Sequence, residues 1–180
     1  MQLVVSLAEL AQDVVQARLH TKPTIGITNG CYDLLHPGHV AMLEQAASLC
    51  DLLVVGVDTD ARVAVLKGEG RPFLGWADRC SILGGLRAVW RIVGLDTADS
   101  LCDVMRRIRP DRYFCRADEP VPETAEAVRL HIYTMALGRH GAWSSTSLAN
   151  HVADRVEYAH AQEAPRDSLR RPRQPETGRT

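Results

Sequence analysis

Two histidines three residues apart, His36 and His39, carry the most specific chemical signal in the sequence. They flank Pro37 and Gly38, and proline is favoured in the first turn of a helix. Gly38 has no side chain, so a ligand can approach the backbone closely there. The spacing puts both imidazoles on one side of the helix start, where free backbone N–H groups and the helix dipole favour an anion. This arrangement suits a phosphate whose negative charge rises during a reaction.

Two other interpretations of the histidine pair remain open at this point. A His-x-x-His pair alone is most often a helix cap or a pair of surface side chains. It can also bind a metal ion, but no third ligand lies at an evident spacing from it. The five cysteines contain no Cys-x-x-Cys pair, so free thiols in a reducing cytosol are expected rather than a zinc knuckle or a disulfide framework.

Composition excludes several classes of protein. A chain of 180 residues, 46% apolar and 24% charged, is typical of one folded domain. The formal net charge of −1 provides no general basic field for nucleic acid or an anionic membrane, so neither is expected as a partner. No apolar run approaches the roughly 18 residues of a membrane span, and the N-terminus lacks a signal-peptide pattern. We expect a cytoplasmic protein.

Hydrophobic periodicity predicts the elements that position the histidines. Helices are expected over residues 6–19, after Pro37, and over about 58–66, 76–86, 99–108 and 145–159, and strands over 24–28, 52–57, 89–93 and 113–115. Strands that alternate with helices predict an α/β fold, a single Rossmann-like doubly wound domain with a mostly parallel sheet. Ligands of such sheets bind beyond the carboxyl ends of the strands.

Two segments near the C-terminus need separate interpretation. Val128, Leu130 and Ile132 alternate and favour a strand, although a helix through Leu137 also fits the pattern. Residues 161–180 contain three prolines, five arginines and almost no apolar mass. We therefore expect the domain over residues 1–160, with the helix at 6–19 included, and a disordered tail over 161–180.

The segment from Thr28 to Val40 resembles the His-x-Gly-His nucleotidyltransferases, which form the cytidylyltransferase-like family. Further matching motifs are Val54–Asp60, Leu66–Gly68, Gly70–Pro72 and Asp78–Arg79. Within this family the sequence is most similar to heptose 1-phosphate adenylyltransferase domains. The resemblance implies transfer of a nucleoside monophosphate, with AMP favoured, to a phosphorylated sugar such as D-glycero-D-manno-heptose 1-phosphate, with release of pyrophosphate. It also implies Mg²⁺ with the nucleoside triphosphate, and a homodimer.

The resemblance assigns roles to individual residues. The implied catalytic residues are His36, His39 and Lys67. The implied nucleotide-binding residues are Thr28, Asn29, Gly30, Cys31, Tyr32, Gly38, Ser144, Ser145 and Thr146. The implied phosphate- or acceptor-binding residues are Asp33, Arg71, Arg79, Arg116 and Asp118. Other roles remain open for some of these, namely fixing the turn for Asp33, a solvated surface position for Arg71 and Arg79, and a helix cap for the Ser/Thr cluster.

The sequence also departs from the family pattern. Cys115-Arg116-Ala117-Asp118 stands where the family has Lys-Gly-Gly-Asp, and Asp58 stands where Asn is common. These departures leave the acceptor open. The alternatives are a CTP-dependent cytidylyltransferase acting on glycerol 3-phosphate or another small phosphate or phosphonate, and a catalytically degenerate nucleotide-binding homologue. A nucleic-acid-binding α/β protein has only the arginine-rich tail in its favour.

Overall fold

The computed structural model describes residues 3–97, 99–116, 122–138, 141 and 143–163. The chain divides into two units, Met1–Ser145 and Thr146–Thr180. The first unit contains the whole sheet, and within the second unit the described residues are helical. The first residues of the expected disordered tail, 161–163, are helical. The rest of that tail, residues 164–180, lies outside the described residues.

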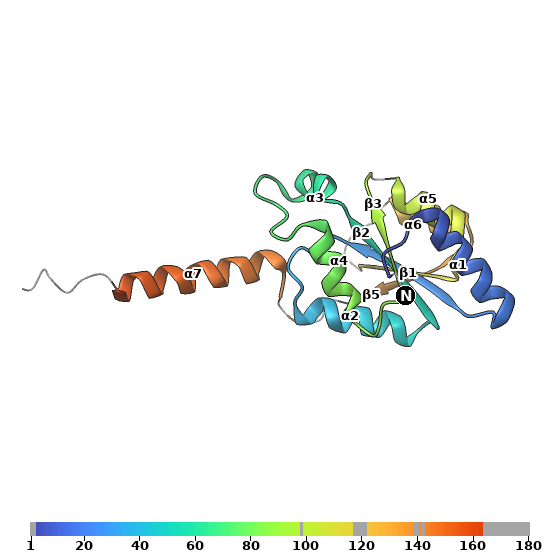
Figure 1. Ribbon diagram of the computed structural model, residues 1–180, viewed down its shortest axis with the longest axis horizontal. Helices are drawn as coiled ribbons and strands as arrows, with labels where there is room; N and C mark the ends of the chain where they lie inside the picture. Colours follow the sequence, from blue (N-terminus) through green and yellow to red (C-terminus); the bar gives the residue numbers. More distant parts are fainter. Residues whose placement is uncertain (1–2, 98, 117–121, 139–140, 142, 164–180) are drawn as a thin grey trace, which may run out of the picture. The chain divides into compact units, whose positions relative to one another are not determined.

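The first unit is built on one sheet of five parallel strands in the order β3-β2-β1-β4-β5 (Figure 1). The strands are β1 (Ile25–Gly30), β2 (Leu52–Asp58), β3 (Arg91–Leu95), β4 (Arg112–Arg116) and β5 (Tyr133–Leu137). The order reverses between β1 and β4, which is the switch point of a doubly wound fold. The predicted α/β Rossmann-like fold with a parallel sheet is confirmed.

Helices cover both faces of this sheet (Figure 1). The helices of the first unit are α1 (Leu7–His20), α2 (Pro37–Ser48), α3 (Asp60–Lys67), α4 (Trp76–Gly84), α5 (Ser100–Ile108) and α6 (Pro122–Arg129). Helix α7 (Ser145–Glu163) belongs to the second unit from Thr146 onward. One apolar core joins α1, α5 and α6 to the sheet, and the other joins α2 and α4 to it. In β2, Val54 faces the first core while Val55 and Val57 face the second. This burial on both faces explains the continuous apolar run of β2.

The predicted strand around Val128–Ile132 is wrong. Helix α6 continues to Arg129, and β5 begins only at Tyr133. Between them the N–H of Ile132 donates to Ala127 O (2.9 Å) and that of His131 to Val128 O (3.0 Å), with His131 at a φ of 58°. These bonds form a Schellman helix end, which glycine usually marks. The apolar alternation therefore spans a helix end and a turn, and a helix through Leu137 is also excluded.

One edge of the sheet is covered by the residues that precede α1. Val4 forms a parallel bridge with Ile92 of β3. The N–H of Ile92 donates to Leu3 O (2.8 Å), and the N–H of Val5 donates to Ile92 O (3.0 Å). This pairing satisfies backbone groups that an edge strand otherwise leaves exposed. Among the described residues, no helix is both long and apolar enough to cross a membrane.

Candidate active site

The two histidines of the motif meet at the N-terminus of α2. His36 caps the helix in an extended conformation, Pro37 follows it in the first turn, and His39 lies within the helix. The centroids of the His36 and His39 rings are 3.8 Å apart, and the ring planes are inclined by 23°. The ring of Tyr32 lies 5.2 Å from that of His39. The strand, the turn and the proline together hold both imidazoles in one place.

His36 is the more buried of the two histidines. Its exposed fraction is 9%, and its Nδ1 has no hydrogen-bond partner among the described residues. Burial, with a smaller contribution from the positive charge of Lys67, lowers the pKa of His36 below its usual value of 6.5. His36 is therefore a neutral imidazole at pH 7, and it can donate one N–H to a ligand oxygen.

A cavity of about 450 Å³ opens where β1, β2 and β4 end. It lies on both sides of the switch point, the expected place for a ligand in this fold. Its volume is within the range of small-molecule sites. It brings together seven of the predicted residues: Thr28, Asn29, Gly30, Cys31, Tyr32, His39 and Lys67.

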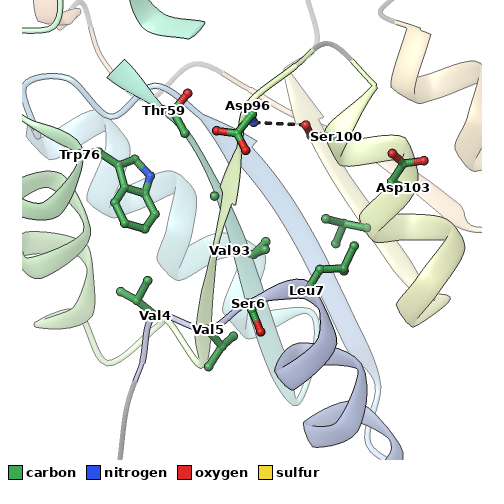
Figure 2. A pocket seen from close by; sticks show the side chains of 12 residues that line it. Val4, Val5, Ser6, Leu7, Thr59, Trp76, Val93, Asp96, Ser100 and Asp103 are labelled. Carbon is green, nitrogen blue, oxygen red and sulfur yellow. Dashed lines mark hydrogen bonds between the residues drawn. The ribbon is translucent and has the colours of Figure 1, made fainter. Parts of the chain in front are cut away.

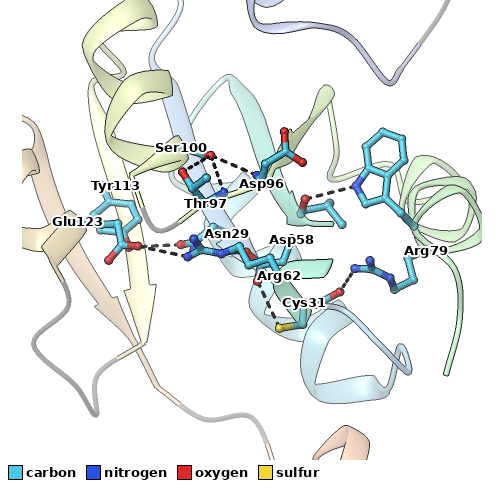
Figure 3. A network of polar contacts seen from close by, with 12 residues as sticks. Asn29, Cys31, Asp58, Arg62, Arg79, Asp96, Thr97, Ser100, Tyr113 and Glu123 are labelled. Carbon is cyan, nitrogen blue, oxygen red and sulfur yellow. Dashed lines mark hydrogen bonds and ion pairs between the residues drawn. The ribbon is translucent and has the colours of Figure 1, made fainter. Parts of the chain in front are cut away.

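The cavity also contains polar residues that the sequence analysis did not assign (Figure 3). Arg62 Nε lies 2.6 Å from Asp58 Oδ1, and Arg62 Nη2 lies 3.8 Å from Glu123 Oε1. The Tyr113 hydroxyl donates to Asn29 Oδ1 (3.3 Å). The spacing of Asp58 and Arg62, four residues apart, is a signal for this ion pair. No comparable signal marks Glu123, because its partner lies far away in the sequence.

Cys31 lies in the cavity but is not suited to act as a nucleophile. Its Sγ donates to Asp58 Oδ2 at 3.2 Å. Burial and the negative charge of Asp58 raise the pKa of the Cys31 thiol to about 12, against the smaller effect of Lys67 and Arg79. Since the thiolate is the reactive form, Cys31 is inert at neutral pH.

Asp33 and Arg71, both predicted to bind phosphate or acceptor, bind each other. Asp33 is fully buried, and its Oδ2 lies 2.5 Å from Arg71 Nη1. Its Oδ1 accepts the backbone N–H of Phe73 (2.6 Å) and that of Leu74 (3.4 Å). These contacts tie the loop that follows α3 to the loop that precedes α2. They agree with the alternative role of Asp33, which is to fix the turn. Neither Asp33 nor Arg71 lines the cavity.

Arg79 is likewise engaged within the fold. Its side chain has no exposed surface, and all three of its nitrogens donate hydrogen bonds. They reach Leu74 O (3.0 Å), Cys31 O (2.5 Å) and Asp60 Oδ1 (2.8 Å). Arg79 thus joins three segments around the site and does not lie on the surface, which was its alternative interpretation. It is also absent from the lining of the cavity.

The remaining predicted residues fall in three groups. The Ser145 hydroxyl accepts the N–H of Leu34 (3.3 Å) and donates to its carbonyl (3.2 Å), which anchors residue 145 beside the turn. Gly38 lies in the first turn of α2, Ser144 precedes α7, and Thr146 begins the second unit. Asp118 and the side chain of Arg116 lie outside the described residues. Binding roles for all of these residues stay predictions.

A larger cavity, of about 630 Å³, lies beside β3 and contains none of the predicted residues (Figure 2). Trp76, Thr59 and Ser100 line it, together with the carboxylates of Asp96 and Asp103. Among the described residues that line it, none is basic. It is therefore poorly suited to a triphosphate, whereas the cavity with His39 and Lys67 offers positive charge.

Comparison with known proteins agrees with the motif. A family model described as cytidylyltransferase-like matches residues 27–146. The chain is 50% identical over 95 residues to the bifunctional protein HldE of Granulibacter bethesdensis, covering 53% of this chain and 19% of that protein. It is 32% identical over 161 residues to the bifunctional protein HldE of Syntrophotalea carbinolica, covering 85% of this chain and 32% of that protein. The chain therefore spans about a fifth to a third of the length of these relatives.

A solved structure shares the fold. The lipopolysaccharide core biosynthesis protein from Thermoplasma volcanium GSS1 superposes with a TM-score of 0.54 at 20% sequence identity. The match covers 68% of this chain and 99% of that one. At this identity the match supports the architecture alone.

Proposed function

The chain belongs to the cytidylyltransferase-like family, and from this premise we propose that it is a nucleotidyltransferase acting on a phosphorylated sugar. It transfers a nucleoside monophosphate, with AMP favoured, from a nucleoside triphosphate to an acceptor such as D-glycero-D-manno-heptose 1-phosphate, and it releases pyrophosphate. The observation that best supports this proposal is the stacked pair of His36 and His39 at a helix N-terminus, beside the cavity that Lys67 lines.

In the proposed reaction a phosphate oxygen of the acceptor attacks the α-phosphorus of the triphosphate in line. A bond forms between that oxygen and the α-phosphorus, and the bond from the α-phosphorus to the bridging oxygen breaks, so its electron pair leaves with pyrophosphate. No protein nucleophile is required, which agrees with the raised pKa of Cys31. Catalysis then consists of positioning the substrates and stabilising charge.

The side chains around the cavity suit those two tasks. His36 and His39 donate N–H groups to the α-phosphate and to the bridging oxygen, where negative charge increases. The N-terminus of α2 adds partial positive charge at the same place. Lys67, the last residue of α3, is exposed and lines the cavity, so its ammonium group can reach the phosphates.

Mg²⁺ enters this proposal as part of the nucleotide substrate. Among the described residues, no group of three or more His, Cys, Asp or Glu side chains is arranged to hold a metal ion. Mg²⁺ typically keeps several waters and is held by one or two carboxylates and the substrate phosphates. We propose that it arrives bound to the triphosphate.

The identities of the donor nucleotide and of the acceptor are also part of this proposal. ATP is favoured because the sequence resembles heptose 1-phosphate adenylyltransferase domains and because the two HldE relatives are 32–50% identical to it. A homodimer follows from the resemblance alone, and light scattering after size-exclusion chromatography would test it.

The proposed function is tested by pyrophosphate release from a matrix of substrates. ATP and CTP are each combined, with Mg²⁺, with D-glycero-D-manno-heptose 1-phosphate, glycerol 3-phosphate and other sugar phosphates. We expect the highest kcat/KM for ATP with the heptose phosphate. Preference for CTP with glycerol 3-phosphate would instead identify a cytidylyltransferase. Thermal stabilisation by nucleotide without turnover of any pair would identify a degenerate homologue.

A further inference from the structure

Part of the cavity wall has no task in the proposed transfer step. It consists of Asp58 at the end of β2, Arg62 on α3 and Glu123 on α6, and we refer to these three residues as the carboxylate wall (Figure 3). The two carboxylates come from opposite sides of the switch point, and Arg62 lies between them. This wall lines the same cavity as His39 and Lys67.

Glu123 is the carboxylate of this wall that accepts no hydrogen bond from another described residue, whereas Asp58 Oδ2 accepts one from Cys31. It is 94% buried, since its exposed fraction is 6%. Within the described part of the chain, its polar contact is the ion pair with Arg62 at 3.8 Å, which is longer than a hydrogen bond. An ionised carboxylate has about four lone-pair positions for donors. Because buried polar groups are almost always hydrogen-bonded, Glu123 is built to accept hydrogen bonds from something in the cavity.

The charges around Glu123 restrict what that ligand can be. Within the wall, the carboxylates of Asp58 and Glu123 outnumber the guanidinium of Arg62, so an anionic group directly against Glu123 would be repelled. The positive charge of Lys67 in the same cavity acts on His36 and Cys31, beside which the phosphates are proposed to bind. A cation is disfavoured by the guanidinium between the carboxylates, and the described residues offer no set of three metal ligands. A neutral ligand that donates hydrogen bonds fits best.

Hydroxyl groups match the alternation of acceptors and donors along the wall. Each hydroxyl both donates and accepts, so a pair on adjacent carbons can donate to a carboxylate and accept from a guanidinium or an amide. Glu123 supplies the acceptor, and Arg62 and Asn29 supply donors nearby in the cavity. The Tyr113 hydroxyl already donates to Asn29 Oδ1, which leaves the NH₂ group of that amide for the ligand.

We propose that Glu123, oriented by Arg62, binds two adjacent hydroxyl groups of a substrate and thereby determines specificity. This inference rests on the proposed function, since it names the part of the substrates that this wall recognises. Such a pair occurs on a sugar acceptor and on the ribose of a nucleotide, and the experiment separates the two sources. Asp58 fixes Arg62 through the 2.6 Å ion pair, so Asp58 and Arg62 are positioning residues.

The test compares wild type with Glu123→Gln, which preserves the shape of the side chain and removes its charge. The matched control is Glu126→Gln, one turn further along α6, because the Glu126 carboxylate is bound by Arg106 and Arg129 and does not line the cavity. The ribose arm uses ATP, 2′-deoxy-ATP and 3′-deoxy-ATP. The acceptor arm uses D-glycero-D-manno-heptose 1-phosphate and its monodeoxy analogues.

We expect Glu123→Gln to raise KM at least about tenfold for one of the two substrates, because hydrogen bonds to charged groups are the stronger ones. The same variant should leave kcat within about threefold. The KM difference from wild type should disappear for the deoxy analogue that lacks the bound hydroxyl. Arg62→Gln should raise KM for the same substrate, and Glu126→Gln should change neither KM. If Glu123→Gln is unfolded by circular dichroism, Glu123→Asp takes its place, since it keeps the charge and retracts the carboxylate.

Failure of this inference can be told apart from failure of the proposed function. If wild type turns over a substrate pair but the Glu123 variant changes neither KM, or changes KM equally for parent and deoxy compounds, the diol subsite is wrong and the transferase stands. If wild type releases no pyrophosphate, the same ligands are titrated calorimetrically. The subsite is supported if the Glu123 variant binds ATP or the heptose phosphate about tenfold more weakly than wild type does, while the two proteins bind the deoxy analogue equally well. Equal binding to both proteins, or no binding to wild type, overturns it.

Discussion

The carboxylate of Asp33 and the guanidinium of Arg71 join the two loops on either side of the site, at 2.5 Å and with Asp33 fully buried. We predict that Asp33→Asn loosens the loop between α3 and α4, because an amide cannot balance the Arg71 charge. The expected loss of stability is about 1.5–3 kcal/mol, the usual contribution of a hydrogen bond to a charged group. Chemical denaturation measures this loss, and faster tryptic cleavage after Lys67 reports the loop directly. Unchanged cleavage would mean that the ion pair does not restrain the loop.

His39→Ala and Lys67→Ala should each lower the rate of transfer by at least about tenfold, or about 1.4 kcal/mol of barrier. Both side chains line the cavity, and in the proposed reaction they stabilise the negative charge that increases on the leaving group. The chain offers a matched control, because Lys22 is its other lysine and does not line this cavity. Lys22→Ala should retain full activity in the pyrophosphate assay. Full activity of both site variants would show that the site has been assigned to the wrong residues.

The lowered pKa of His36 predicts a pH dependence of stability with a definite sign. Burial disfavours the charged imidazole in the fold, so the unfolded chain binds more protons at pH values below its usual pKa of 6.5. The free energy of unfolding should therefore fall as the pH decreases from 6.5 towards the lowered pKa. His36→Gln should remove this part of the dependence, as denaturation at several pH values would measure. An NMR titration that places the wild-type His36 pKa above 6.5 would contradict the prediction.

Replacing Arg79 should lower the stability of the fold, because its donors bind other parts of the chain. Its replacement by Met leaves the partly buried carbonyls of Cys31 and Leu74 without their donor, at up to about 1–3 kcal/mol for each. Urea denaturation should show this loss in the Arg79→Met variant. Arg87→Met, an exposed arginine just beyond α4, is the control and should unfold like wild type. A stable Arg79→Met protein with impaired turnover would instead favour the predicted role in phosphate binding.

Much of the fold follows from apolar periodicity, because β1 and β2 and the helices on either side of them are buried in regular patterns. The boundary of α6 and β5 does not follow from it. His131 takes the left-handed conformation that glycine usually signals, so the helix end has no recognisable marker in the sequence.

Some residues of the candidate site can likewise be predicted from the sequence, and others cannot. His36 and His39 belong to a local motif that the sequence alone identifies, and Lys67 is assigned through the family resemblance. The contact of Glu123 with Arg62, and those of Arg79 with Cys31 and Asp60, join residues far apart in the chain, which no local pattern encodes. An arginine in a sequence also gives no sign of whether it faces a ligand or a buried carbonyl. This ambiguity explains why Arg79 appears among the predicted binding residues although its donors are engaged in the fold.

The pairing of Leu3 and Val5 with Ile92 has a practical consequence for protein engineering. A version of the chain shortened to start at α1 would leave the outer backbone groups of β3 open to strands from other molecules, a known route to aggregation. Expression plasmids for crystallography should therefore retain residues 3–5, of which Val5 and Val4 are partly buried against the two apolar cores. Solubility of the shortened and the full-length chain at equal concentration would measure how much this short segment protects.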